Sequence, residues 1–330
     1  MDIEKWSLRI GTAALLFAVV LRLGVSGVFG KALEMLRTPE AVSTILFLET
    51  GRMVYAATPH AVSQPYQPVT ITPSVPEAEE PAVPVFVPED ANLVKIKNVC
   101  GLKTDVPSLL TSPLAWQLQA AEPTVLILHS HGSESYENTE NFKESGYYRT
   151  LDDRYNMVSI GDRVAQILEA GGISVIHDTT LHDHPSYNDS YNNSRSSMKE
   201  YLDKYPSIRL VLDLHRDAAR DKEGNQVGLT ATIDGKKVAK LMMVVGTNVR
   251  LKHPNWPENM SLAVKLHALL EKNYPGICRP ISFRNQRFNQ DLSPGALLIE
   301  VGAAGNDRQE ALASAEILAQ AILDLSHGTG

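Results

Sequence analysis

Residues 125–134 read VLILHSHGSE, four apolar residues followed by a polar loop that contains glycine. A continuous apolar run of this length is typical of a strand in the middle of a parallel sheet. Two further runs have the same form, because LVLDL at 210–214 leads into His215 and ALLI at 296–299 leads into Glu300. Open α/β sheets gather their ligands at the carboxyl ends of strands, so the three runs predict one shared site.

The rest of the apolar pattern extends this expectation to a fold class. Strand-like runs occur at 124–128, 173–176, 210–214, 241–245 and 296–300. Between them, apolar residues recur at helical spacing around 160–168, 262–270 and 312–322, and the first of these patterns ends at Gly171-Gly172. The alternation predicts an α/β fold with a mixed, mostly parallel sheet and helices on both faces.

Composition excludes several classes of protein. The 330 residues carry a formal net charge of -7, and their basic residues are dispersed, which argues against nucleic-acid binding. A hydrophobic content of 43% is enough for a sizeable core. The two cysteines, Cys100 and Cys278, are too few for a zinc knuckle or a disulfide framework. We interpret them as separate thiols, with one long-range disulfide as the alternative.

The first part of the chain differs from the rest. Residues 10–30 are almost wholly apolar apart from Arg22, and their number is about that needed to cross a bilayer. We expect residues 1–30 to form an uncleaved signal-anchor, a single transmembrane helix that leaves the bulk of the chain outside the cytoplasm; a cleaved signal peptide is the alternative. Residues 31–57 then form a juxtamembrane region, 58–91 a proline-rich linker, and 92–330 the catalytic domain.

The residue types at the strand ends predict a zinc hydrolase. Such an enzyme needs about three protein ligands and an open position for water, and His131, Glu134 and His215 can supply the ligands. It also needs a carboxylate that moves protons without binding the metal, which is the role expected for Glu300. Strand alternation points His129 to the same side as His131, so His129 is a rival ligand.

Each of these assignments has a simpler structural alternative. His215 would then be a core histidine bonded to a backbone carbonyl, and Glu300 would pair with Arg284 or Arg287. Polar segments near the strand ends supply further candidates for substrate contacts, since planar donors suit amides and sugar hydroxyls. The candidates are Arg216, His182, Arg287, Asn289 and Gln290.

Several segments, in this order, resemble the stage II sporulation protein P family over roughly residues 92–325. The matching segments are HSHGSESY at 129–136, His177-Asp178 with Pro185-Ser186-Tyr187, DLHRDA at 213–218, NQDLSPG at 289–295 and Glu300-Val301-Gly302. The resemblance implies a fold similar to zinc-dependent N-acetylmuramoyl-L-alanine amidases, in which His, Glu and His bind zinc and a late Glu is catalytic. His131, His215 and Glu300 match that order. The middle ligand departs from it, because the amidases place their Glu at the start of a helix, where this chain reads Asp152-Asp153-Arg154.

The resemblance also implies a biological setting. It implies a membrane-anchored hydrolase that cleaves the amide between N-acetylmuramic acid and L-alanine of peptidoglycan, and also peptide cross-links, during engulfment in endospore formation. The expected partners are stage II sporulation proteins D and M, and the expected location is the space between the two membranes of the sporangium. Two alternatives stay open: a non-catalytic module that binds the cell wall or acts as a scaffold, and a carboxypeptidase-like zinc peptidase.

Overall fold

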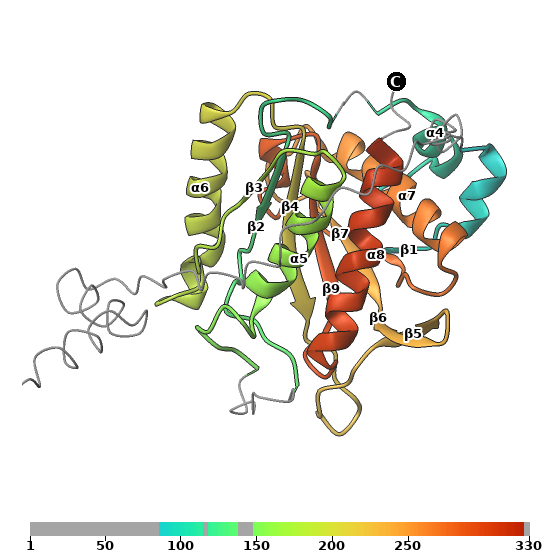
Figure 1. Ribbon diagram of the computed structural model, residues 1–330. Coiled ribbons are helices and arrows are strands. Elements are labelled where there is room, and N and C mark those ends of the chain that lie inside the picture. The colour runs from blue at the N-terminus through green and yellow to red at the C-terminus, as the bar shows by residue number, and fades with distance from the viewer. Residues whose placement is uncertain (1–85, 115–117, 138–147, 327–330) are drawn as a thin grey trace, which may run out of the picture. The chain divides into compact units, whose positions relative to one another are not determined.

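The computed structural model describes residues 86–114, 118–137 and 148–326, all of which belong to one compact unit, residues 77–330. A seven-stranded sheet in the order β1-β8-β7-β9-β4-β2-β3 forms its centre (Figure 1). The strands are β1 (Ile96–Asn98), β2 (Val125–Leu128), β3 (Val175–His177), β4 (Leu210–Asp217), β7 (Leu241–Val245), β8 (Ile281–Phe283) and β9 (Ala296–Ala303). Within this sheet β7 and β9 pair antiparallel and the other neighbours pair parallel. The predicted mixed, mostly parallel sheet is confirmed.

Helices cover both faces of the sheet. They are η1 (Pro88–Leu93), α4 (Val106–Thr111), α5 (Met157–Ala170), η2 (Tyr187–Asp189), α6 (Ser190–Lys204), α7 (Trp256–Asn273), η3 (Gln290–Leu292) and α8 (Arg308–Ser326). Apolar residues of α5, α7 and α8 form one large cluster with strand residues such as Ile127, Leu212 and Ile299. On the opposite face, Met198 of α6 packs against Leu126 and Leu128.

Part of this second face is not covered by a helix. Beside the α6 cluster, Met242, Val244 and Leu298 pack with Tyr191 and Phe288. Because side chains alternate along a strand, residues 213 and 215 of β4 and residue 300 of β9 point to this same face. The polar residues of the predicted site therefore lie on this second face, where Asp213 and His215 are themselves buried.

The compact unit begins earlier than the predicted boundary at residue 92. Phe86 and Ala91 pack against the main core, and Lys272 lies 3.4 Å from Asp90. The end of the expected linker is therefore part of the folded unit, because Phe86 and Ala91 are partly buried against the main core. The rest of the linker, the juxtamembrane region and the expected signal-anchor lie outside the described residues. Within the described ranges, no helix is long and apolar enough to span a bilayer.

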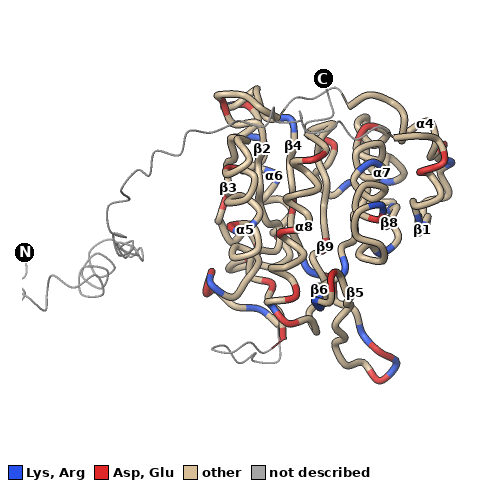
Figure 2. Tube along the Cα trace, turned by 45° about the vertical axis from the view of Figure 1, so that its right-hand side comes forward, with Lys and Arg blue, Asp and Glu red and all other residues tan. Residues whose placement is uncertain are grey.

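Two smaller features complete the described part of the chain. Strands β5 (Thr230–Ile233) and β6 (Lys236–Ala239) pair as a separate antiparallel hairpin. Figure 2 shows Lys and Arg interspersed with Asp and Glu along the described chain rather than gathered on one face.

Candidate active site

His215 and Glu300 face each other across two neighbouring strands. Strand β4 continues to Asp217 and β9 to Ala303, so both residues lie inside strands rather than beyond their ends as the apolar runs predicted. Each strand thus extends past its apolar run, and the polar residue that follows the run is still part of the strand. The Cα atoms of His215 and Glu300 are direct partners in the parallel register. Backbone pairing thus places the predicted zinc ligand beside the predicted proton carrier.

Asp213 fixes the orientation of His215. The Nε2 atom of His215 donates to Asp213 Oδ1 at 2.8 Å. Asp213 also accepts from the Ser130 backbone N–H at 2.7 Å and from its hydroxyl at 2.6 Å, so the carboxylate cannot turn freely. Burial opposes a charge on His215, but the Asp213 carboxylate outweighs it and raises the pKa of His215 to about 9. The network leaves Nδ1 of His215 facing Glu134 Oε2, 3.7 Å away.

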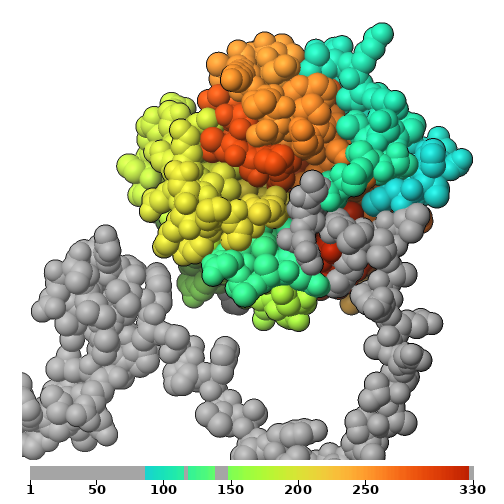
Figure 3. All heavy atoms as spheres, turned by 90° about the horizontal axis from the view of Figure 1, so that it is seen from above, coloured from blue at the N-terminus to red at the C-terminus, as the bar shows by residue number. Residues whose placement is uncertain are grey.

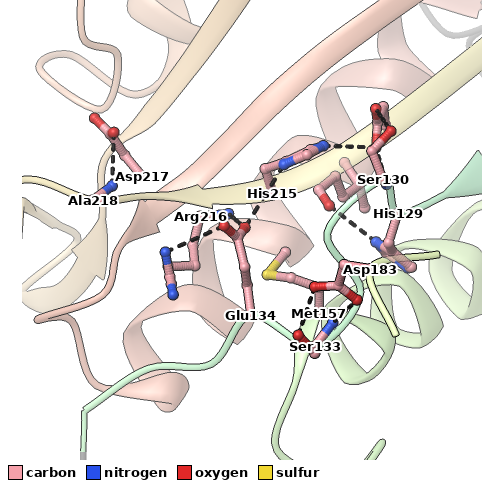
Figure 4. A network of polar contacts seen from close by, with 12 residues as sticks. His129, Ser130, Ser133, Glu134, Met157, Asp183, His215, Arg216, Asp217 and Ala218 are labelled. Atoms are coloured by element: carbon pink, nitrogen blue, oxygen red, sulfur yellow. Dashed lines mark hydrogen bonds and ion pairs between the residues drawn. The ribbon is translucent and has the colours of Figure 1, made fainter. Parts of the chain in front are cut away.

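Glu134 is held by Arg216, as Figure 4 shows. Its two oxygens accept from the Arg216 backbone N–H at 3.2 Å and from Nη1 at 3.3 Å. The same guanidinium donates to the backbone carbonyls of Ser135 and Tyr148. Both side chains are less than a tenth exposed, so this is a buried ion pair. The sequence had predicted Arg216 as a substrate contact, whereas the structure places it beneath the site as the partner of Glu134.

His131 forms the other wall of the site. Its ring stacks on Tyr187 with centroids 4.3 Å apart and meets the His215 ring edge-on at 5.3 Å. Its Nδ1 atom is shielded from solvent and has no hydrogen-bond partner. Burial, followed by the nearby His215, lowers the pKa of His131 to about 3, so its imidazole is neutral at physiological pH.

The rival ligand His129 has both ring nitrogens engaged. Nδ1 bonds the carbonyl of Leu214 at 3.0 Å, and Nε2 lies 2.9 Å from Nε2 of His177. Asp162 in turn lies 2.9 Å from Nδ1 of His177. His129 therefore belongs to a chain of hydrogen bonds that runs toward α5, while His131 is the histidine of this pair with a free buried nitrogen.

The chemistry of these donors fits zinc for two of the three predicted ligands. His131 is neutral with an unsatisfied nitrogen, and His215 has the carboxylate partner that metal-binding histidines usually have. The carboxylate of Glu134 is engaged by Arg216 instead. In the described ranges, no group of three or more His, Cys, Asp or Glu side chains is arranged as a metal site. The zinc assignment, and Glu134 as its middle ligand, stay predictions.

Glu300 opens onto a hollow of about 280 Å³. Its Oε2 atom is shielded and has no hydrogen-bond partner. Desolvation raises the pKa of Glu300 to about 8; the charge of His215 acts against this, and those of Glu134 and Asp217 add to it. The arginines considered as structural partners have other contacts, because Arg284 donates to Ser282 and Arg287 lies 3.4 Å from Asp291. A carboxyl group with a pKa near neutral is suited to both accepting and donating a proton.

The other predicted substrate contacts fall into two groups. His182 is buried and bonds the His129 carbonyl and Ser197, and the amide of Gln290 bonds Gly246 and Val244. These two side chains hold the surrounding backbone in place. Arg287 and Asn289 line a second hollow, although the amide of Asn289 also bonds the Tyr191 carbonyl. Their contact with substrate stays a prediction.

Four residues that shape the site were not among the predicted site residues: Asp213, Tyr187, Tyr191 and Phe288. Asp213 and Tyr187 lie in segments that carried the family resemblance, but neither was given a role in the site. A sequence signal existed for Asp213, because alternation along a strand puts residues 213 and 215 on one side. The aromatic residues carry no such signal. They reach the site from η2, α6 and the loop before η3, which only tertiary packing brings together.

Comparison with known proteins adds the evolutionary relationship. Solved structures similar to this one include N-acetylmuramoyl-L-alanine amidases of Clostridium difficile 630 and Nostoc punctiforme, each 17% identical, covering 62% of this chain and 94% of theirs, with TM-scores of 0.38 and 0.37. The stage II sporulation protein P of Bacillus subtilis is 31% identical over 220 residues, which are 63% of this chain and 52% of the relative. The chain thus spans about half the length of that relative. Residues 67–323 match the stage II sporulation protein P family, to which this chain belongs.

Proposed function

We propose that this protein is a zinc-dependent hydrolase that cleaves the N-acetylmuramoyl-L-alanine amide of peptidoglycan during engulfment in endospore formation. The observation that carries the proposal is the register pairing of His215 with Glu300, next to His131. Two polar atoms at this point, His131 Nδ1 and Glu300 Oε2, are shielded without a partner. Such unsatisfied atoms are costly in a folded protein and indicate a ligand or substrate site.

The proposed reaction is hydrolysis of an amide. Glu300 accepts a proton from the attacking water, and the water oxygen adds to the amide carbonyl carbon. Glu300 then returns a proton to the nitrogen of L-alanine as the carbon–nitrogen bond breaks, so the products are a lactyl carboxyl group and a free amine. Desolvation raises the pKa of Glu300 to about 8 in the metal-free protein, so this site favours the protonated carboxyl and uptake of a proton from water.

The chain's other residues position the reacting groups. Asp213 holds the His215 ring, and Tyr187 stacks on the His131 ring. His131, His215 and, by prediction, Glu134 would hold a zinc ion. When bound, zinc supplies Lewis-acid activation of water and of the carbonyl.

The cellular setting is part of the same proposal. The predicted signal-anchor places the catalytic domain outside the cytoplasm, in the space between the membranes of the sporangium. Stage II sporulation proteins D and M are proposed partners there, and cleavage of peptide cross-links is a proposed second activity. Support for this setting comes from membership of the family.

A variant of Glu300 tests the proposed chemistry. In the purified full chain, Glu300→Gln should keep its circular dichroism spectrum and its zinc content, but lose at least roughly a hundredfold in hydrolysis of purified cell walls. Glu316→Gln is the control, because Glu316 lies on α8 and pairs with Arg163. Near-normal hydrolysis by Glu300→Gln would contradict the assigned role.

A further inference from the structure

A second hollow adjoins the one that contains Glu300. It has a volume of about 360 Å³ and is lined by Arg195, Arg250, Arg287, Tyr191, Leu251 and Phe288, among others. We call it the arginine hollow. Tyr191, Gln286 and Phe288 line both hollows, so they form a shared wall. A ligand that extends from Glu300 across this wall enters the arginine hollow.

The charges in the arginine hollow are unbalanced. Arg195 pairs with both oxygens of Asp291 at 2.8 and 2.7 Å, and Arg287 lies 3.4 Å from the same carboxylate. Arg250 is exposed and has no hydrogen bond or ion pair with any described residue. Three guanidinium groups thus line this hollow, and the two that have a charged partner, Arg195 and Arg287, share one carboxylate, so positive charge is in excess. An anionic ligand would complete this arrangement, and guanidinium groups bind carboxylates with paired hydrogen bonds.

The wall between the hollows has a fixed, strained backbone. Phe288 and Asn289 have φ values of 50° and 57°, in the left-handed region that residues other than glycine rarely adopt. Side-chain bonds from Asn289 to α6, and from Gln290 to Gly246 and Val244, hold this turn. The turn also needs Gly246, since a Cβ there would lie 2.4 Å from the Gln286 carbonyl oxygen. Strain of this kind persists where the surrounding contacts impose it, and it is frequent at binding sites.

The two sides of the scissile bond differ in charge. On the glycan side, N-acetylmuramic acid presents neutral hydroxyl and acetamido groups, whereas the stem peptide carries free carboxylates. We infer that the arginine hollow binds a free carboxylate of the stem peptide, with Arg250 as its main contact. This inference rests on the proposed function and gives the substrate a direction: the peptide lies over Phe288, and the glycan lies toward Tyr187 and His131. Phe288 belongs to the segment that leads into β9, and Figure 3 shows this segment between α6 and α7.

Peptide binding tests the inference separately from catalysis. The full chain, carrying Glu300→Gln to prevent turnover, is titrated by calorimetry with a stem tetrapeptide that has free carboxylates and with the same peptide fully amidated. The same titrations are repeated with Arg250→Gln and with the control Arg163→Gln, each added to the Glu300→Gln chain. The control also removes one arginine, but from α5 on the other side of the sheet. Arg250 has no partner among the described residues, so its replacement leaves the fold intact.

We expect Arg250→Gln to lose affinity selectively for the peptide that has free carboxylates. Arg250→Gln should raise the dissociation constant of the free-carboxylate peptide at least about tenfold and leave that of the amidated peptide unchanged, and Arg163→Gln should change neither. Equal binding of the two peptides, or binding that does not depend on Arg250, would overturn the inference. So would Arg250-dependent binding of poly(glycerol phosphate) without binding of the peptide. If the peptide binds through Arg250 but the unmodified chain cleaves no wall amide, the proposed function fails and the carboxylate site stands.

Discussion

His215 shows how a single side chain depends on its neighbours in this site. Three carboxylates surround it: Asp213 bonds its Nε2, Glu134 lies near its Nδ1, and Glu300 is its partner across the sheet. Asp213 lies two residues earlier on the same strand, so strand geometry alone aims it at the histidine. The apolar runs before His131, His215 and Glu300 were enough to predict that these three residues lie near one another. The contact between Glu134 and Arg216 was not predictable, because the strand pattern indicates which residues gather at one edge of the sheet and not which of their side chains pair there.

Replacement of Asp213 tests its role in positioning His215. Asp213→Asn keeps the shape of the side chain but removes the charge that fixes the imidazole. Partners of this kind typically change metal affinity by about 10- to 100-fold, so zinc affinity measured by competition with a chelator should fall by that factor. Asp162→Asn is the matched control, because Asp162 bonds His177 and not His215. Unchanged zinc affinity in Asp213→Asn would show that His215 is not a ligand that depends on this partner.

Replacement of Glu134 separates a structural role from a role in metal binding. Glu134→Ala leaves the buried guanidinium of Arg216 without its carboxylate, which typically costs about 3–5 kcal/mol. Urea unfolding of the metal-free protein should show this loss. Replacement of a residue that acts only as a metal ligand would destabilise the protein only in its zinc-loaded form. Normal stability of metal-free Glu134→Ala would therefore contradict the structural role.

Helix α6 is the longest described element that the sequence pattern did not reveal. It is rich in Ser, Asn and Lys, and its buried residues are only Ser190, Ser194 and Met198, so it lacks the apolar stripe by which α5, α7 and α8 were found. Strands β1 and β8 were missed because their sequences, IKN and ISF, contain polar residues and form no continuous apolar run. Tertiary contacts instead stabilise α6, and Arg195 joins it to Asp291 in η3.

The Arg195–Asp291 pair makes this link depend on pH. Partial burial opposes ionisation of Asp291, but the hydrogen bonds from Arg195 outweigh it and hold the pKa of Asp291 below its usual range. A carboxyl group with a lowered folded pKa stabilises the protein fully above its unfolded pKa, about 4, and this contribution disappears as the pH falls through the folded value. Arg195→Met should therefore lower the free energy of unfolding by about 1–3 kcal/mol at pH 7, and the difference from the wild type should shrink below pH 4.

A partly exposed ion pair provides the control for this measurement. Arg163→Met breaks the contact with Glu316, in which both side chains are more than a third exposed, so its cost should stay below about 1 kcal/mol. Chemical unfolding of both variants between pH 2 and 7 provides the comparison. A cost for Arg195→Met that is the same at pH 3 as at pH 7 would contradict the ion-pair explanation.

The described protein is a sheet with two different faces. One face is covered by α5, α7 and α8 and provides most of the core, while α6 covers only part of the other. The fold class was predictable because buried parallel strands and apolar helices leave strong sequence patterns. The open face was not, because it results from the position of a polar helix and from the turn at Phe288 and Asn289. The site therefore lies on the face of the sheet as well as toward the ends of its strands.

Identification of the reaction products is the most direct test of amide cleavage by this protein. Purified peptidoglycan is digested with the zinc-loaded full chain, and the soluble products are separated and identified by mass spectrometry. We expect glycan strands with free lactyl groups together with stem peptides that begin with L-alanine, and neither product with Glu300→Gln. Release of single amino acids, cleavage confined to peptide bonds, or binding to the wall without new products would contradict this expectation.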